Sequence, residues 1–136
     1  MTVIMGHAMM KWILILVATM IAGLMAIATF GCGGGNTPSE TVDEFYRLME
    51  KKDCQKVADL VSETSPKAPD TYVNDCKQIA DRLVSYSIKR ETIDESGFFA
   101  RVDTEVTINE NGKEKTNSTW LHLVKVGDDW KLTSIP

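Results

Sequence analysis

The sequence has few of the residues from which most active sites are built. It contains two histidines, His7 and His122, and three cysteines, Cys32, Cys54 and Cys76. Because a zinc site needs four ligands and no histidine lies near Cys54 or Cys76 at ligand spacing, we expect no metal centre. The sequence also lacks a phosphate-binding glycine loop and the nucleophile elbow of hydrolases. These absences favour a non-catalytic protein that uses no cofactor.

Basic residues are also too few for a nucleic-acid-binding protein. The chain has 15 Lys and Arg against 19 Asp and Glu, a formal net charge of −4 at pH 7. Lys11 is the only charged residue among positions 1–31, which leaves 14 basic against 19 acidic residues, or −5, for the remainder. Nucleic acid binding needs a basic patch, commonly with interleaved aromatic residues, and the sequence has none. We therefore expect no nucleic acid partner.

Charge is absent from a long apolar run, Trp12 to Phe30, which directly follows Lys11. A basic residue before an apolar core is typical of a signal peptide. The run is longer than the roughly 7–15 residues of a usual signal core and close to the roughly 20 residues that span a bilayer. Residues 1–31 are therefore predicted to be either a cleaved signal peptide or an uncleaved membrane anchor.

The apolar run ends in Thr29-Phe30-Gly31-Cys32, and three glycines follow. This tetrapeptide resembles the bacterial lipobox, in which a small residue precedes the cysteine that receives a lipid. Gly31 and Cys32 match the lipobox, whereas Thr29 and Phe30 depart from its commoner residues. The resemblance implies cleavage before Cys32, a lipid such as palmitate on that cysteine, and a flexible tether over residues 32–36. With or without cleavage, the rest of the chain is expected on the extracytoplasmic side of the cell membrane.

If Cys32 carries the lipid, Cys54 and Cys76 remain as a pair. Two cysteines in an oxidising compartment favour a disulfide. The loop between them would then stabilise the fold by on the order of 3 kcal/mol in the chain-entropy account. The alternative is a pair of buried free thiols, since cysteine packs well in protein cores.

Residues 37–136 read as one domain with helices first and strands afterwards. Thr37-Pro38-Ser39-Glu40 is typical of a helix start, with a capping threonine and a glutamate three residues later. Apolar residues at helical spacing predict helices over about 37–52, 53–61 and 70–84. Beyond Val84 the apolar residues alternate, which predicts strands over 85–93, 98–109, 113–126 and 130–135. The predicted fold class is α+β, with three N-terminal helices packed on a curved antiparallel sheet of about four strands.

Four short segments resemble a known family: Val42–Tyr46, Lys51–Cys54, Ala58–Val61 and the final Gly127–Leu132. They resemble the exported lipoprotein branch of the nuclear transport factor two-like superfamily, whose domains are cone-shaped and cystatin-like. The resemblance covers about residues 38–136 and implies a half-open cone that encloses a pocket. Members of this superfamily include enzymes, small-molecule binders and interaction domains, and they often dimerise through the sheet.

Few residues qualify as site candidates. Catalytic members of the superfamily typically place an Asp–His pair or a Tyr–Asp set inside the cone, and no such set can be mapped here. His122, Tyr86 and Trp120 are the candidate pocket residues, although each also suits ordinary packing. Asp103 and Glu105 fall on one side of a strand, as expected of a solvated face paired with Lys or Arg.

These observations predict a membrane-tethered extracytoplasmic lipoprotein with a non-catalytic ligand-binding or protein-interaction domain. The expected partners are the membrane, through the lipid on Cys32, and an unidentified small molecule or envelope protein, with homodimerisation through the sheet as a further option. The alternative is a small lyase or isomerase with a cone-shaped pocket, which requires at least two ionisable groups that converge inside the cone. A third hypothesis is a structural lipoprotein whose sheet face docks a partner.

Overall fold

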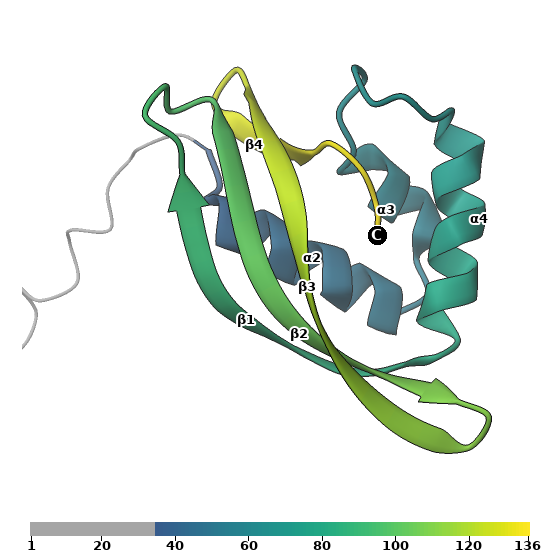
Figure 1. The fold of residues 1–136 in the computed structure, drawn as a ribbon. Coiled ribbons are helices and arrows are strands. Elements are labelled where there is room, and N and C mark those ends of the chain that lie inside the picture. Colours follow the sequence, from purple (N-terminus) through teal and green to yellow (C-terminus); the bar gives the residue numbers. More distant parts are fainter. Residues whose placement is uncertain (1–34) are drawn as a thin grey trace, which may run out of the picture. The chain divides into compact units, whose positions relative to one another are not determined.

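The structure is a computed structural model and describes residues 35–136. The predicted signal or anchor segment and the predicted lipidation site, Cys32, lie outside the described residues. Three helices precede four strands (Figure 1): α2 (Pro38–Glu50), α3 (Cys54–Asp59), α4 (Pro69–Ala80), β1 (Leu83–Ile93), β2 (Phe99–Glu110), β3 (Lys113–Val126) and β4 (Asp129–Leu132). This order confirms the predicted α+β class.

Helix α2 begins where the sequence predicts, at a complete capping box. The Thr37 hydroxyl accepts a hydrogen bond from the Glu40 amide at 3.1 Å, and the Glu40 carboxylate accepts one from the Thr37 amide at 2.7 Å. Pro38 occupies the first helical position, where its missing N–H leaves no partner unsatisfied. The buried face of α2 carries Val42, Phe45, Tyr46 and Met49, so this helix supplies much of the core.

The four strands form one antiparallel sheet in the order β1-β2-β3-β4. The β2–β3 hairpin turns at Asn111 and Gly112, whose φ angles of 54° and 80° are those that the Asn-Gly turn signal predicts. Two register shifts interrupt the β1–β2 ladder, between Leu83 and Ser85 and between Ile88 and Arg90. Such irregularities bend a strand, and the sheet curves around α2 (Figure 1).

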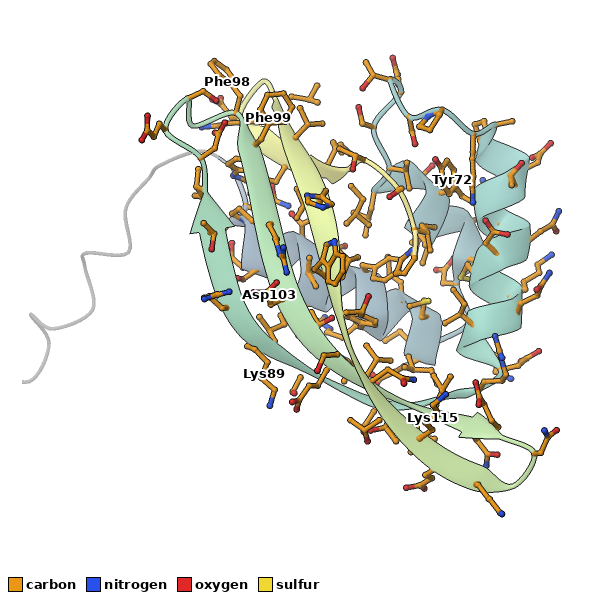
Figure 2. All side chains as sticks on the ribbon, in the orientation of Figure 1. Tyr72, Lys89, Phe98, Phe99, Asp103 and Lys115 are labelled. Carbon is orange, nitrogen blue, oxygen red and sulfur yellow. A yellow bond between two sulfur atoms is a disulfide. The ribbon has the colours of Figure 1, made fainter. Side chains whose placement is uncertain are left out.

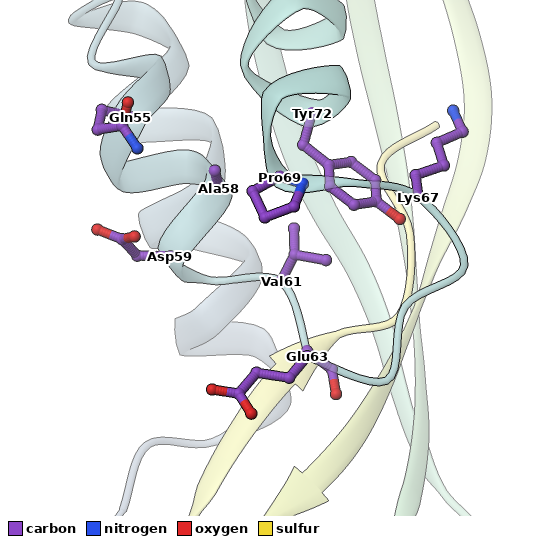
Figure 3. A pocket seen from close by; sticks show the side chains of 9 residues that line it. Gln55, Ala58, Asp59, Val61, Glu63, Lys67, Pro69 and Tyr72 are labelled. Atoms are coloured by element: carbon purple, nitrogen blue, oxygen red, sulfur yellow. The ribbon is translucent and has the colours of Figure 1, made fainter.

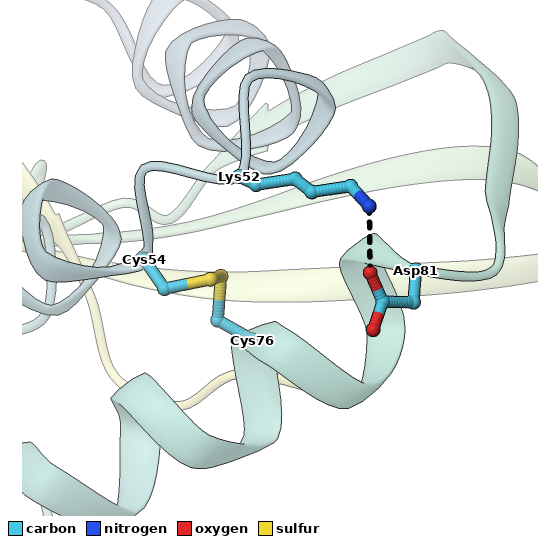
Figure 4. Close-up of a disulfide and its surroundings, with 4 residues drawn as sticks. All are labelled: Lys52, Cys54, Cys76 and Asp81. Atoms are coloured by element: carbon cyan, nitrogen blue, oxygen red, sulfur yellow. Dashed lines mark hydrogen bonds and ion pairs between the residues drawn. A yellow bond between two sulfur atoms is a disulfide. The ribbon is translucent and has the colours of Figure 1, made fainter.

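A disulfide joins α3 to α4, as predicted (Figure 4). Cys54 and Cys76 are both buried, and their Cα atoms lie 5.6 Å apart. A second link lies beside it, where the Lys52 ammonium donates to the Asp81 carboxylate at 2.8 Å. The disulfide therefore fixes the two shorter helices to each other at one side of the core.

Two element boundaries differ from the sequence prediction. Helix α4 ends at Ala80, and β1 begins at Leu83, because the backbone there pairs with the far end of β2, where Asn109 N donates to Arg82 O at 2.7 Å. The last strand stops at Leu132, because it pairs with β3 only over Val126 to Leu123. Within residues 35–136, no helix combines the length and apolar character needed to cross a membrane.

Candidate functional site

The space between the helices and the sheet is filled by apolar and aromatic side chains. Among residues 35–136, the buried polar residues besides tyrosine and cysteine are Thr41, Ser62 and Thr104, and no carboxylate, histidine, lysine or arginine is buried. The largest fully buried side chains include Tyr46, Tyr72, Phe45, Met49, Leu121 and Leu123. The space between the helices and the sheet is therefore a packed core built around α2 and the inner face of β2 and β3.

One tyrosine–carboxylate contact lies at the edge of this core, between α2 and β1. The Tyr86 hydroxyl donates to Asp43 Oδ1 at 2.8 Å, and the Tyr86 ring stacks on Tyr46 with centroids 4.6 Å apart. Burial, followed by the hydrogen bond to Asp43, raises the pKa of Tyr86 to about 12. A phenol with that pKa stays protonated at neutral pH and is poorly matched to proton transfer there.

Tyr46 has a similar structural role deeper in the core. Its hydroxyl lies 3.2 Å from the Thr104 hydroxyl, and burial raises its pKa above the ordinary tyrosine value. Tyr46 is one of the aromatic residues that could line a pocket by sequence alone, whereas Asp43 is not among the site residues that the sequence predicts. The amphipathic pattern of α2 marks Tyr46 as inward-facing, but nothing in the sequence pairs Asp43 with Tyr86 forty-three positions away.

The three candidate pocket residues do not line one cavity. Tyr86 faces the helices, opposite the buried Val106 of β2. Trp120 and His122 alternate with the buried Leu121 and therefore lie on the other face of the sheet, where both are exposed. The sheet itself separates Tyr86 from the other two residues.

Trp120 and His122 belong to a different surface, which we call the outer patch: Arg101, Trp120, His122 and Val124. Arg101 lies opposite His122 in the β2–β3 register, and its guanidinium carbon lies 4.6 Å from the centroid of the Trp120 ring. Trp120 nevertheless keeps 52% of its surface exposed. Trp120 is therefore a half-exposed aromatic side chain with one face against an arginine.

Charged side chains hold Arg101 in this position. Asp103 accepts a hydrogen bond from Arg101 Nε at 2.6 Å and two from Arg90, at 3.1 and 2.9 Å. These contacts hold the pKa of the Asp103 carboxyl below its ordinary value, and the hydrogen bond from Arg101 has the largest effect. Glu105 pairs with Lys89 at 2.7 Å on the same face. Asp103 and Glu105 therefore lie on the paired face that their spacing predicts. Figure 2 labels Asp103 on β2 and Lys89 on β1.

A concave surface lies between α3 and the loop that precedes α4 (Figure 3). It has a volume of about 280 Å³, and its lining includes Asp59, Glu63, Lys67 and Tyr72. The Lys67 ammonium pairs with Asp75 at 3.0 Å and lies 5.8 Å from the Tyr72 ring centroid. The Tyr72 hydroxyl bonds to Ser65. Because Lys67 and Tyr72 are engaged within the protein, this hollow presents mainly the exposed carboxylates of Asp59 and Glu63.

No protein-family model matches the chain, and no curated protein sequence matches it. Several solved structures share its fold. A SEC-C motif containing protein from Rhodopseudomonas palustris is similar, with a TM-score of 0.61 and 12% identity, over 72% of this chain and 76% of that one. A function unknown protein from Mycobacterium tuberculosis has a TM-score of 0.56 and 14% identity, over 96% of this chain and 74% of that one.

A third similar structure carries the fold name itself. The protein called Rd1NTF2_04 with long sheet has a TM-score of 0.54 and 17% identity, over 71% of this chain and 99% of that one. Likeness at these identities shows the fold alone. It bears out the nuclear transport factor two-like architecture that the sequence motifs imply.

Proposed function

We propose that this protein is a lipoprotein, tethered through Cys32 to the extracytoplasmic side of the cell membrane, whose domain binds a partner without catalysing a reaction. The Cys54–Cys76 disulfide supports export, because disulfides persist mainly in oxidising compartments. The tether and the lipid are carried by the resemblance of Thr29–Cys32 to a lipobox and by the apolar run before it.

The observation that carries the binding role is the outer patch. Trp120 is 52% exposed and lies under Arg101, whose guanidinium donates a hydrogen bond to Asp103. Tryptophan and arginine are enriched among the residues that dominate protein–protein binding energies. A rigid aromatic side chain also loses little conformational freedom when a partner covers it. The preferred partner is accordingly a protein, either an envelope protein or a second copy of this chain through the sheet.

The packed interior supports the choice of binding over catalysis. A lyase or isomerase would need two ionisable groups that converge on a substrate inside the cone. In the described part of the chain, Asp43 and Tyr86 are two ionisable groups that do meet beside the core, but they bond to each other at its edge. A small-molecule partner would be expected in the hollow beside α3 rather than inside the cone.

Site-specific photocrosslinking in intact cells tests this proposal. A photoreactive phenylalanine analogue replaces His122 in the outer patch, and a matched chain carries it at Gln78, an exposed position on α4. We expect a defined covalent adduct from position 122 and none from position 78, and we expect Trp120→Ala to abolish that adduct. The mass of the adduct separates a second copy from a different protein.

Two results would contradict the proposed binding role. One is an adduct from position 122 no more abundant than that from position 78. The other is an adduct that persists unchanged when Trp120 is replaced, because the partner would then not depend on the outer patch.

A further inference from the structure

Four exposed apolar residues lie at one end of the sheet, and we call them the apolar rim: Ile93, Phe98, Phe99 and Val126. Their exposed fractions are 46%, 59%, 56% and 51%. Backbone hydrogen bonds bring their segments together, from Asp94 N to Phe99 O at 2.9 Å and from Lys125 N to Phe98 O at 2.8 Å. Figure 2 shows Phe98 and Phe99 at the tip of the β1–β2 hairpin.

The loop that presents the two phenylalanines is internally braced. The Asp94 carboxylate accepts hydrogen bonds from the Ser96 hydroxyl at 2.8 Å and from the Phe99 amide at 3.2 Å. These bonds hold the pKa of Asp94 below its ordinary value, and the hydrogen bond from Ser96 has the largest effect. The loop that carries Phe98 and Phe99 is therefore supported by hydrogen bonds of its own.

The described chain begins at the same end of the domain. Gly35 packs directly against the backbone carbonyl of Asp128, in the turn between β3 and β4. Asn36 Oδ1 then accepts a hydrogen bond from the Trp130 amide at 3.1 Å. Trp130 pairs with Lys125, which in turn bonds to Phe98. Neighbouring strands lie about 4.8 Å apart, so only about 10 Å of sheet separates β4 from β2.

The predicted lipid attachment is close to this point in the sequence. Only two residues, Gly33 and Gly34, lie between Cys32 and Gly35, and a fully extended chain covers at most about 3.6 Å per residue. We infer that the apolar rim is a membrane-contact surface, which lies in the headgroup region of the leaflet that holds the lipid. This inference rests on the lipidation of Cys32 proposed above.

Charge specifies the kind of lipid surface. Four carboxylates lie beside the apolar rim, those of Asp94 and Glu95 in the β1–β2 loop, of Asp128 in the β3–β4 turn and of Asp129 at the start of β4, and they outnumber the one ammonium group at the adjoining end of β3, that of Lys125. Anionic headgroups would repel them, whereas zwitterionic headgroups would not. The surface that fits the rim is therefore a leaflet of low negative charge. Because the lipid keeps the rim at a high local concentration beside the bilayer, a weak contact suffices to orient the domain.

Quenching of tryptophan fluorescence by brominated lipids tests this inference. The full chain with Phe98→Trp is purified from membranes and reconstituted into phosphatidylcholine vesicles with and without brominated phosphatidylcholine. The matched control is Val84→Trp, since Val84 is 43% exposed but lies at the opposite end of β1. The unsubstituted chain supplies the background of the native tryptophans.

Apolar residues that rest in the interface lie about 5–10 Å deep, within reach of bromine on the upper acyl chain. We expect at least a twofold loss of the added emission for Phe98→Trp, little loss for Val84→Trp, and weaker quenching as anionic lipid is added. Equal quenching of the two variants in lipidated protein overturns the inference and leaves the lipid anchor standing. An intact mass without lipid overturns both.

Discussion

At the scale of single residues, the surface around Trp120 depends on one carboxylate. Asp103 holds Arg101 over the Trp120 ring and also holds Arg90. The side chain of Asp103 is only 21% exposed, less than either arginine partner. Without Asp103 the two guanidinium groups would repel each other, and Arg101 would lose the contact that fixes its orientation.

Replacing this carboxylate should give a stability effect that depends on pH. The folded-state pKa of Asp103 is lowered, so its stabilising contribution is present above the unfolded value, about 3.9, and is lost as the pH falls through the folded value. Urea unfolding of the original chain and of Asp103→Asn should therefore differ at pH 7 and converge in acid. A difference between the two that is the same at pH 7 and pH 3 would contradict this role.

At the scale of elements, the capping box of α2, the Asn111-Gly112 turn and the α3–α4 disulfide were all predictable, because each depends on residues close in sequence or on a simple pairing. Which face of β3 is buried was not predictable from the sequence. Trp120 and Val124 alternate with Leu121 and Leu123, so both faces of the strand look apolar. Only the packing of the helices decides which set is buried.

The two neighbours Trp120 and Leu121 offer a direct check of that orientation. Leu121 is 2% exposed, so Leu121→Ala should cost about 2–5 kcal/mol of unfolding free energy. Trp120→Ala removes an exposed ring and one cation–π contact and should cost less than about 1 kcal/mol. Chemical denaturation of the two variants measures both values. The reverse order would mean that Trp120 faces the core.

The disulfide can be tested at the same scale. Cys54→Ala combined with Cys76→Ala should lower the unfolding free energy by about 3 kcal/mol, because the unfolded chain regains the freedom of the closed loop. Thermal or urea unfolding without reductant measures the loss, and the original chain with reductant is the control. An unchanged midpoint in both would mean that the helices do not depend on this bond.

At the scale of the whole molecule, the described part of the chain, residues 35–136, has its helices on one face of the sheet and none of its helices on the other (Figure 1). The covered face closes around apolar side chains, whereas the open face carries Trp120, Arg101 and their charged supports. This arrangement is the one on which the proposed binding role depends. The start of the described chain lies at the end that carries Phe98, so a short tether there would set which end of the domain meets the membrane.

The intact mass of the protein extracted from its own membranes, denatured but not reduced, tests the central claim of a tethered extracytoplasmic domain most directly. The predicted mass begins at Cys32, includes a diacylglyceryl group, and is two hydrogens short because Cys54 and Cys76 are bonded. An unmodified mass that retains residues 12–31 would contradict the lipid anchor and would mean that the apolar run itself holds the protein in the membrane.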